Sequence, residues 1–197
     1  MLLNYDSTQP LYVVGQSISA NEIFFFIAQE IKNQAKLITK EDLVNLPDRS
    51  QCVIGFQNIN DRADFINQDI VKKFSWPSFI HSQAYVANPW LIQQGVVIWP
   101  QVCIGIKAEI GKFSSIAQQC SIGHGSNLGQ NNILCTSTVI AGSTSTEQNV
   151  FFGQCSSVKD KIKIGKDITF LMSSVVTKNI EQSGIYFGNR MVPKITI

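Results

Sequence analysis

The chain has 197 residues and is almost balanced in charge, with 16 basic and 14 acidic side chains and a formal net charge of +2. It carries no basic tract, so its composition gives no reason to expect nucleic acid or an anionic membrane surface as a partner. The apolar run at 23–28 is too short to span a bilayer, and the N-terminal residues lack the pattern of a signal peptide. Five cysteines without a CxxC pair favour a reduced, cytoplasmic protein, and we expect no metal site.

The first 78 residues predict a small α/β unit. Residues 1–10 show no pattern and are expected to form a loose lead-in. The apolar pattern then predicts strands at 11–15, 36–39, 51–56 and 78–80, helices at 20–35 and 60–74, and a helical turn at 41–46. This alternation is typical of a small parallel, Rossmann-like sheet. A unit of about seventy residues is small for an independent domain, so we expect it to pack on the rest of the chain or on a neighbouring subunit.

From residue 80 to 179, an aliphatic residue or Phe recurs at every sixth position. The column comprises Ile80, Val86, Ile92, Ile98, Ile104, Ile110, Ile116, Ile122, Leu128, Leu134, Ile140, Thr146, Phe152, Val158, Ile164, Phe170 and Val176. Only Thr146 is not a hydrophobe, and Asn132 is the bulky polar exception in a second inward column two positions earlier. Since helices repeat every 3.6 residues and strands every two, this period indicates a β-helix of about five to six coils.

Small residues form a third column, one position after the aliphatic one. Its members include Gly105, Gly111, Gly123, Gly129 and Gly165. We expect them at tight corners, often with positive φ. Residues 180–197 leave the period and are expected to form a terminal strand or tail that covers the open end of the β-helix.

Several motifs carry a resemblance to a known family. They are Ile80-His81, the single His of Gly123-His124-Gly125, the VVTKN segment at 175–179, and Gly188-Asn189. With them the whole chain resembles the PglD/NeuD-type sugar acetyltransferases, a branch of the left-handed β-helix (hexapeptide-repeat) acyltransferases. The resemblance implies an α/β nucleotide-sugar-binding domain at 1–78 and a left-handed parallel β-helix with a C-terminal tail at 79–197. It also implies a homotrimer with active sites between subunits.

The candidate catalytic residue is His124, which we expect to project outward from a coil corner. A neutral imidazole can take the proton from an attacking amine or hydroxyl. The resemblance implies that Gly142 supplies a backbone N–H for the oxyanion and that acetyl-CoA lies in the cleft beside the C-terminal coils. The candidate cofactor-binding residues are Gly142, Gly153 and Lys178; Lys178 is either a contact of the CoA phosphates or a plain surface lysine. The resemblance places the nucleotide-sugar acceptor at the loop with Gly15 and Ser17, which precedes a helix N-terminus.

The sequence departs from the family pattern at several of these positions. Gly123 and Gly125 stand where the family usually has acidic neighbours of its catalytic His. Ala117 replaces an Asn of the preceding coil, and Ile133 replaces a second His that many members carry. The acidic pair that usually follows the second strand is missing after Thr39.

These observations predict an acetyl-CoA-dependent acetyltransferase that acts on a nucleotide-linked amino sugar in surface glycan biosynthesis, with N-acetylation favoured over O-acetylation. Two alternatives remain: a catalytically degenerate homologue that acts as a binding or scaffold subunit, and an acyltransferase with a non-sugar acceptor. His81 is expected to close the turn between the two domains. Trp90 and Trp99 are expected to point outward, into a subunit interface or a cleft.

Overall fold

The computed structural model describes residues 1–31 and 34–193. Its N-terminal unit contains a parallel sheet in the order β3-β2-β4, formed by β2 (Leu11–Val14), β3 (Ala35–Ile38) and β4 (Gln51–Ile54). Around the sheet lie α1 (Ile18–Glu30), α2 (Ile59–Ile66) and the short 3-10 helices η1 (Glu41–Asn45) and η2 (Asp69–Lys73). The predicted strand–helix alternation is therefore confirmed.

Helix boundaries differ from the prediction because capping residues set them. Helix α1 begins two residues earlier than expected, because the Ser17 hydroxyl accepts a hydrogen bond from the Ala20 N–H at 3.1 Å. Helix α2 begins where the Asn58 side chain accepts from the N–H groups of Asn60 and Asp61. It ends at Ile66, and the rest of the predicted helix is η2.

The prediction of a loose lead-in at 1–10 is wrong. Strand β1 (Leu2–Leu3) pairs antiparallel with β5 (Ser78–Ile80), the first strand of the β-helix. The N-terminal ammonium of Met1 donates to the Ile80 carbonyl at 2.6 Å and lies 3.6 Å from the Glu30 carboxylate. The sequence gives no signal for β1, because a strand of two residues is too short to show an apolar period.

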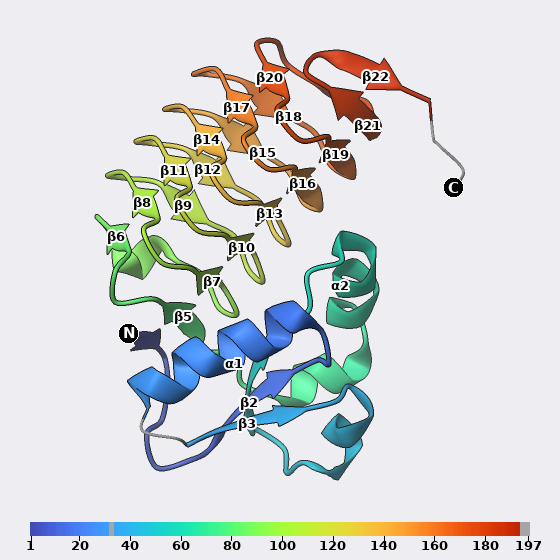
Figure 1. Ribbon diagram of the computed structural model, residues 1–197. Coiled ribbons are helices and arrows are strands. Elements are labelled where there is room, and N and C mark those ends of the chain that lie inside the picture. The colour runs from blue at the N-terminus through green and yellow to red at the C-terminus, as the bar shows by residue number, and fades with distance from the viewer. Residues whose placement is uncertain (32–33, 194–197) are drawn as a thin grey trace.

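The remainder is a parallel β-helix with three sheets, stacked on the N-terminal unit (Figure 1). The first sheet contains β5, β7 (Val97–Ile98), β10 (Ser115–Ile116), β13 (Ile133–Leu134), β16 (Val150–Phe152), β19 (Ile168–Phe170), β21 (Gly184–Phe187) and β22 (Arg190–Val192), with β1 at its edge. The second contains β6 (Tyr85–Val86), β8 (Cys103–Ile104), β11 (Ser121–Ile122), β14 (Val139–Ile140), β17 (Ser157–Val158) and β20 (Val175–Val176). The third contains β9 (Glu109–Ile110), β12 (Asn127–Leu128), β15 (Ser145–Thr146) and β18 (Lys163–Ile164); a short 3-10 helix, η3 (Pro89–Leu91), precedes them.

Each coil repeats after eighteen residues, so that Ile116 pairs with Leu134 and Ile122 with Ile140. We call the turns from first to second sheet (such as 118–119) the first corner, those from second to third (such as 124–125) the second corner, and those from third to first (such as 130–131) the third corner. The predicted aliphatic column fills the core: apart from Val86, which packs against it half-buried, its hydrophobes are buried.

The two polar exceptions in the inward columns are partners. Asn132 and Thr146 are both buried, and the Asn132 side-chain amide donates to the Thr146 hydroxyl. The amide oxygen of Asn132 accepts from the Val150 N–H at 2.8 Å. One hydrogen-bonded pair therefore accounts for both departures, since buried polar groups require partners.

The glycine column has a different cause from the one predicted. Positive φ occurs two residues later, at corner positions such as Lys107, Asn131 and Ser143, and most of these are not glycine. The glycines of this column have no room for a side chain. A Cβ on Gly105 would lie 2.8 Å from the backbone nitrogen of His124 in the next coil, and a Cβ on Gly129 would lie 2.6 Å from the backbone carbonyl carbon of Glu147. Stacking distance, rather than backbone conformation, keeps this column small.

A chain of hydrogen bonds at the third corner ties the N-terminal unit to the β-helix. Arg62 of α2 is fully buried, and its guanidinium donates to the carbonyls of Phe56 and Phe113 and to Asn131 Oδ1. Asn131 Nδ2 then donates to Asn149 Oδ1 at 3.0 Å, and Asn149 Nδ2 to Asp167 Oδ1 at 2.9 Å. Burial lowers the pKa of Arg62, and the ladder ends at the exposed carboxylate of Asp167.

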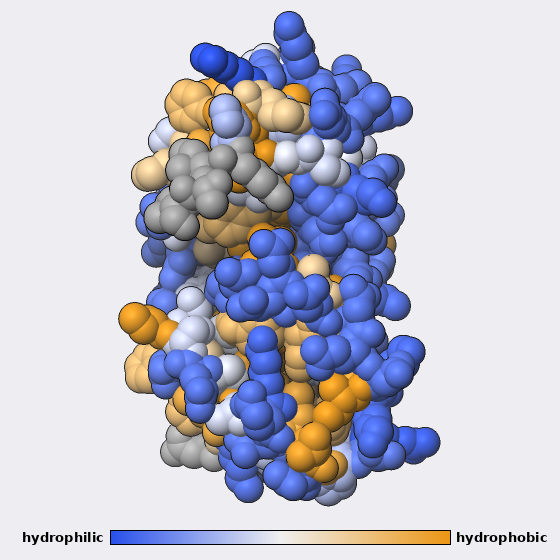
Figure 2. Space-filling model, turned by 90° about the vertical axis from the view of Figure 1, so that its right-hand side faces the viewer, coloured by the Kyte–Doolittle hydropathy of each residue, from blue (hydrophilic) through white to orange (hydrophobic). Residues whose placement is uncertain are grey.

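The end of the β-helix is closed by an antiparallel hairpin of β21 and β22, which confirms the predicted terminal strand. At its turn, Asn189 Oδ1 accepts from the N–H groups of Thr177 and Lys178. Figure 2 shows a mainly hydrophilic side of the molecule, with hydrophobic residues exposed both near this end and near the opposite end. Phe187 and Met191 are exposed at the hairpin. Residues 194–197 of the predicted tail lie outside the described residues.

Candidate active site and acceptor pocket

His124 stands on the second corner, as the sequence predicts. It is exposed, two residues after the end of β11, and its carbonyl accepts from the Ser143 N–H of the next coil at 2.8 Å. Within residues 1–31 and 34–193, no group forms a hydrogen bond to its ring. The ring is therefore held by packing alone in this chain, in keeping with the glycines on both sides.

Gly142 makes room for the His124 ring. A Cβ at this position would lie 2.8 Å from His124 Nε2, so any larger residue would displace the imidazole. The Gly142 N–H has no acceptor among the described groups, while its carbonyl accepts from Lys161. A free backbone N–H thus lies in the residue over which the imidazole packs, an arrangement suited to a base beside an oxyanion donor.

The remaining predicted cofactor residues lie on two corners. Lys178 is exposed on the second corner of the last coil, and Lys159 and Lys161 are exposed on the corner between it and Gly142. Gly153 lies on the first corner instead, where a Cβ would collide with the backbone of Leu171 and Met172. The structure therefore brings His124, Gly142 and Lys178 to one edge and separates Gly153 from them within one chain.

The loop residues of the N-terminal unit lie far from this edge in the fold. Gly15, Lys40 and Phe56 follow β2, β3 and β4, so they meet at the carboxyl edge of the sheet, around a hollow of about 150 Å³. This edge is where open parallel sheets bind ligands. Lys40 Nζ lies 4.0 Å from the centre of the Phe56 ring, and Ser17 serves as the cap of α1 rather than lining the hollow.

A larger pocket of about 380 Å³, which we call the α1 pocket, lies between α1 and the outer face of the first sheet. Its lining comprises Ser19, Glu22, Gln57, Trp99, Ser115, Ala117, Gln118, Ile133, Leu134, Cys135, Thr136, Phe151 and Gln154. Trp99 points outward from the first sheet and lines this pocket, as predicted, but it packs edge-on against Phe26 of α1 and is 5% exposed, so α1 of the same chain rather than a neighbouring subunit buries it. Burial raises the pKa of the Cys135 thiol to about 11, which leaves it neutral.

Sequence reasoning missed this pocket but singled out two of its residues. Ala117 and Ile133, the positions at which the family pattern has Asn and His, both line it. Glu22, Gln57 and Gln118 gave no periodic signal, because they meet only when α1 packs across the early coils (Figure 1).

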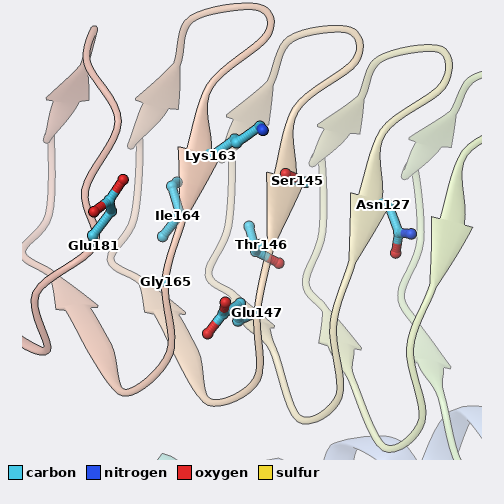
Figure 3. Close-up of a pocket in the computed structure, with 8 residues that line it drawn as sticks. All are labelled: Asn127, Ser145, Thr146, Glu147, Lys163, Ile164, Gly165 and Glu181. Atoms are coloured by element: carbon cyan, nitrogen blue, oxygen red, sulfur yellow. The ribbon is translucent and has the colours of Figure 1, made fainter.

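A third hollow, of about 450 Å³, lies on the outer face of the third sheet (Figure 3). Its lining includes two carboxylates, Glu147 and Glu181, and one amine, Lys163. Ile164 and Gly165 also line it. Thr146, which borders it, uses its hydroxyl for the internal pair with Asn132. No predicted site residue lies there.

The outer face of the second sheet carries no charge. Its outward residues are Tyr85, Cys103, Ser121, Val139, Ser157 and Val175, and Tyr85, Val139 and Val175 are among the exposed large hydrophobic residues. The third sheet, by contrast, presents Glu109, Asn127, Ser145 and Lys163. An uncharged column between the first and second corners is typical of a surface that another protein covers.

His81 takes the structural role that the sequence predicts. Its Nδ1 accepts from the Gln83 N–H at 3.1 Å, and its ring packs edge-on against Phe26 with centres 5.0 Å apart. Burial lowers the pKa of this imidazole, although Glu30 acts in the opposite direction.

Within the described part of the chain, no helix is long and apolar enough to cross a membrane. In the same residues, no three Cys, His, Asp or Glu side chains come together as a metal-binding group.

No protein-family model and no curated protein sequence matches the chain. Solved structures with a similar fold include the acetyltransferase domain of PglB from Neisseria gonorrhoeae, with a TM-score of 0.84 and 16% identity over 94% of this chain and 99% of that one. A variant of perosamine N-acetyltransferase from Caulobacter crescentus, crystallised with CoA and GDP-perosamine, has a TM-score of 0.78 and 17% identity over 89% and 92%. WeeI from Acinetobacter baumannii has a TM-score of 0.68 and 16% identity over 93% and 100%.

These likenesses extend over both parts of the chain, the small parallel sheet as well as the β-helix. At such identities they establish the architecture. The chain therefore has the two-part fold of the β-helix sugar acetyltransferases. Its sequence motifs resemble those of the same proteins.

Proposed function

We propose that this protein transfers an acetyl group from acetyl-CoA to a nucleotide-linked amino sugar, with His124 as the general base. The proposal rests on the geometry of the second corner. There the exposed imidazole of His124 packs over Gly142, whose backbone N–H has no acceptor among the described groups. The similar PglB domain and perosamine N-acetyltransferase were crystallised with acetyl-CoA, or with CoA and a GDP-linked sugar, which supports the same pair of substrates here. Surface glycan biosynthesis is the pathway that the resemblance implies.

The active protein would be a homotrimer that packs through the uncharged face of the second sheet. That sheet lies between the first and second corners, so a threefold arrangement around it sets the second corner of one chain beside the first corner of the next. His124 would then face a neighbour's α1 pocket, which is bordered by the first-corner residues Gln118, Thr136 and Gln154. The site is incomplete in one chain, because its two halves lie on opposite edges of the second sheet.

In this arrangement the acceptor nitrogen attacks the thioester carbonyl carbon while His124 takes a proton from it. The Gly142 N–H stabilises the oxyanion that forms. The C–S bond then breaks, and the CoA thiolate leaves and is protonated. The nucleotide of the acceptor would be held at the carboxyl edge of β2–β4, near Gly15 and the N-terminus of α1 that Ser17 caps.

The CoA phosphates need cations above the reacting centre. Lys159, Lys161 and Lys178 supply them on the coils that follow Gly142 along the second corner, with Asp160 the acidic residue among them. Gly153 of a neighbouring chain would lie across the same cleft, where its backbone would border the pantetheine arm; its missing side chain is required by the stacking of the next coil.

The test is CoA thiol release with a panel of UDP-, dTDP- and GDP-linked amino sugars. Wild type should turn over one of them, and His124→Ala should lose about a hundredfold or more in kcat, the range for a general base. Gln148→Ala is the matched control, an exposed side chain on the third corner, and it should keep full activity. Turnover that survives His124→Ala would refute the assignment of the base.

A binding or scaffold role is the second candidate, and specific observations favour it. His124 has neither an acidic neighbour nor a hydrogen-bond partner in the described residues, and Ala117 and Ile133 have made the facing pocket less polar. Acetyl-CoA that binds saturably without turnover on any acceptor would establish this role. Turnover on an acceptor that is not a sugar would instead retain His124 and change the substrate class.

A further inference from the structure

We infer that Glu22 is the residue of the α1 pocket that recognises the amine of the acceptor. The inference rests on the proposed function for the identity of the acceptor as a sugar. It concerns one chain, because all walls of the pocket come from the same chain.

Glu22 is the one charged residue among those that line the pocket. Its Oε1 accepts from Gln118 Nε2 at 3.2 Å, while Oε2 has no donor within residues 1–31 and 34–193. Glu22 is exposed at the mouth of the pocket, so the pocket carries one negative charge and one carboxylate oxygen that is open to solvent or to a ligand. An aliphatic amine is protonated at neutral pH and satisfies both, whereas a hydroxyl acceptor brings no charge to balance.

The side-chain amide of Gln57, in the wall of the pocket, lacks a hydrogen-bond partner among the described groups. The nitrogen and oxygen of its side-chain amide are both buried and form no hydrogen bond among the described groups. A buried amide without partners costs free energy, so its presence in the wall indicates a group that the chain alone does not provide. A sugar hydroxyl donates and accepts, and it can serve both atoms of the amide once the side chain turns toward the pocket.

The floor of the pocket is apolar. Trp99, Ile133 and Phe151 project from the outer face of the first sheet, and Trp99 uses its indole N–H on Ser115 rather than on a ligand. An apolar floor suits the CH face of a pyranose ring or a methyl substituent. With about 380 Å³ the pocket is within the range of small-molecule sites.

These features give Glu22 a task different from that of His124. Glu22 is a specificity-determining residue that binds the ammonium form of the acceptor. The ammonium gives one proton to solvent, which frees the nitrogen lone pair, and His124 of a neighbouring chain takes the second proton as the nitrogen attacks. His124 has no acidic neighbour in the sequence, and the Glu22 carboxylate then supplies a negative charge on the acceptor side of the cleft.

The experiment measures binding rather than turnover. The probes are methyl glycosides of 6-deoxyhexoses with an amine at C3 or C4, each compared with its hydroxyl counterpart, and the affinities are determined by NMR titration of the full-length protein. We expect wild type to bind one amine probe about tenfold or more tightly than its counterpart, the scale of a hydrogen bond to a charged group. Glu22→Gln should abolish this preference, and Glu109→Gln, an exposed carboxylate on the outer face of the third sheet, should retain it.

Equal affinity for amine and hydroxyl probes, no binding of any amine probe, or a preference that survives Glu22→Gln would each overturn the inference. Glu22-dependent amine binding without acetyl transfer to any acceptor would support it and would refute the proposed function alone. The two can therefore fail separately.

Gln57→Leu provides a second readout. Because the amide forms no hydrogen bond within the described residues, the variant should unfold at no lower a temperature than wild type. It should nevertheless bind both probes several-fold more weakly. Unchanged probe affinity in this variant would show that the amide has no part in ligand binding.

Discussion

The β-helix and the N-terminal unit bury their hydrophobic residues in different ways. The core of the β-helix is one continuous column made of its own residues, from Ile80 to Tyr186. The sheet of the N-terminal unit has a cluster on each side, and both include residues of the β-helix: Phe113 in one, and Val97 and Trp99 in the other. The β-helix is thus self-contained, while the unit beside it depends on the early coils for its stability.

The largest effect should come from crowding two coils. A Cβ on Gly111 would lie 2.5 Å from the Gly129 carbonyl oxygen, so Gly111→Val should cost more than the roughly 1–3 kcal/mol typical of overpacking and should unfold both regions together. Chemical denaturation measures the loss. Gly125→Asn is the control, because a Cβ there meets only Ser143 Oγ at 3.6 Å and Asn tolerates its φ of +64°.

The next effect should separate the two regions. Arg62→Met leaves two carbonyls and Asn131 Oδ1 without their buried donor, which should cost about 3 kcal/mol or more. Hydrogen exchange should show lost protection in β2–β4 while the late coils stay protected. The exposed Arg49→Met is the control and should be neutral; equal loss in both regions would contradict the dependence of one on the other.

A smaller effect should be confined to the β-helix core. Thr146→Val removes the partner of Asn132 Nδ2 and should lower the free energy of unfolding by about 1–3 kcal/mol, since that donor is buried. Ser145→Val, which alters the outward residue of the same strand, should change stability little. Equal stabilities of the two variants would mean that the internal pair contributes nothing net.

The smallest effect should be a pH dependence at the junction. Because burial lowers the pKa of His81, the unfolded chain binds a proton more readily than the folded one below about pH 6.5. Stability should therefore rise with pH through that window and fall as the pH drops. His81→Gln should flatten this slope in thermal melts from pH 5 to 7, and the exposed His124→Ala should keep it.

The predictable part of the fold was the part with a period. Eighteen-residue coils repeat one geometry, so a single column of aliphatic residues predicted the strands from β6 to β20 and the corner that carries His124. Its two exceptions, Asn132 and Thr146, needed the structure to be recognised as partners, because they lie 14 residues apart in the sequence and in two different columns.

The features that sequence reasoning missed all depend on packing between distant segments. Strand β1, the ladder from Arg62 to Asp167 and the α1 pocket each join residues that no periodicity relates. The glycine column was found, but its cause was mistaken, because close approach of neighbouring coils and positive φ both favour glycine and only the backbone distinguishes them.

The stacking of the coils also makes the β-helix a measuring scale. Neighbouring strands lie about 4.8 Å apart, so Lys161 and Lys178, two and three coils beyond His124, stand about 10 and 14 Å along the axis from it. Inserting or deleting a whole coil between His124 and these lysines would move the lysines along the axis by one strand spacing, about 4.8 Å, and would leave every corner in register. In the proposed trimer, the length of the acyl carrier that fits the cleft would therefore change in steps of one eighteen-residue coil.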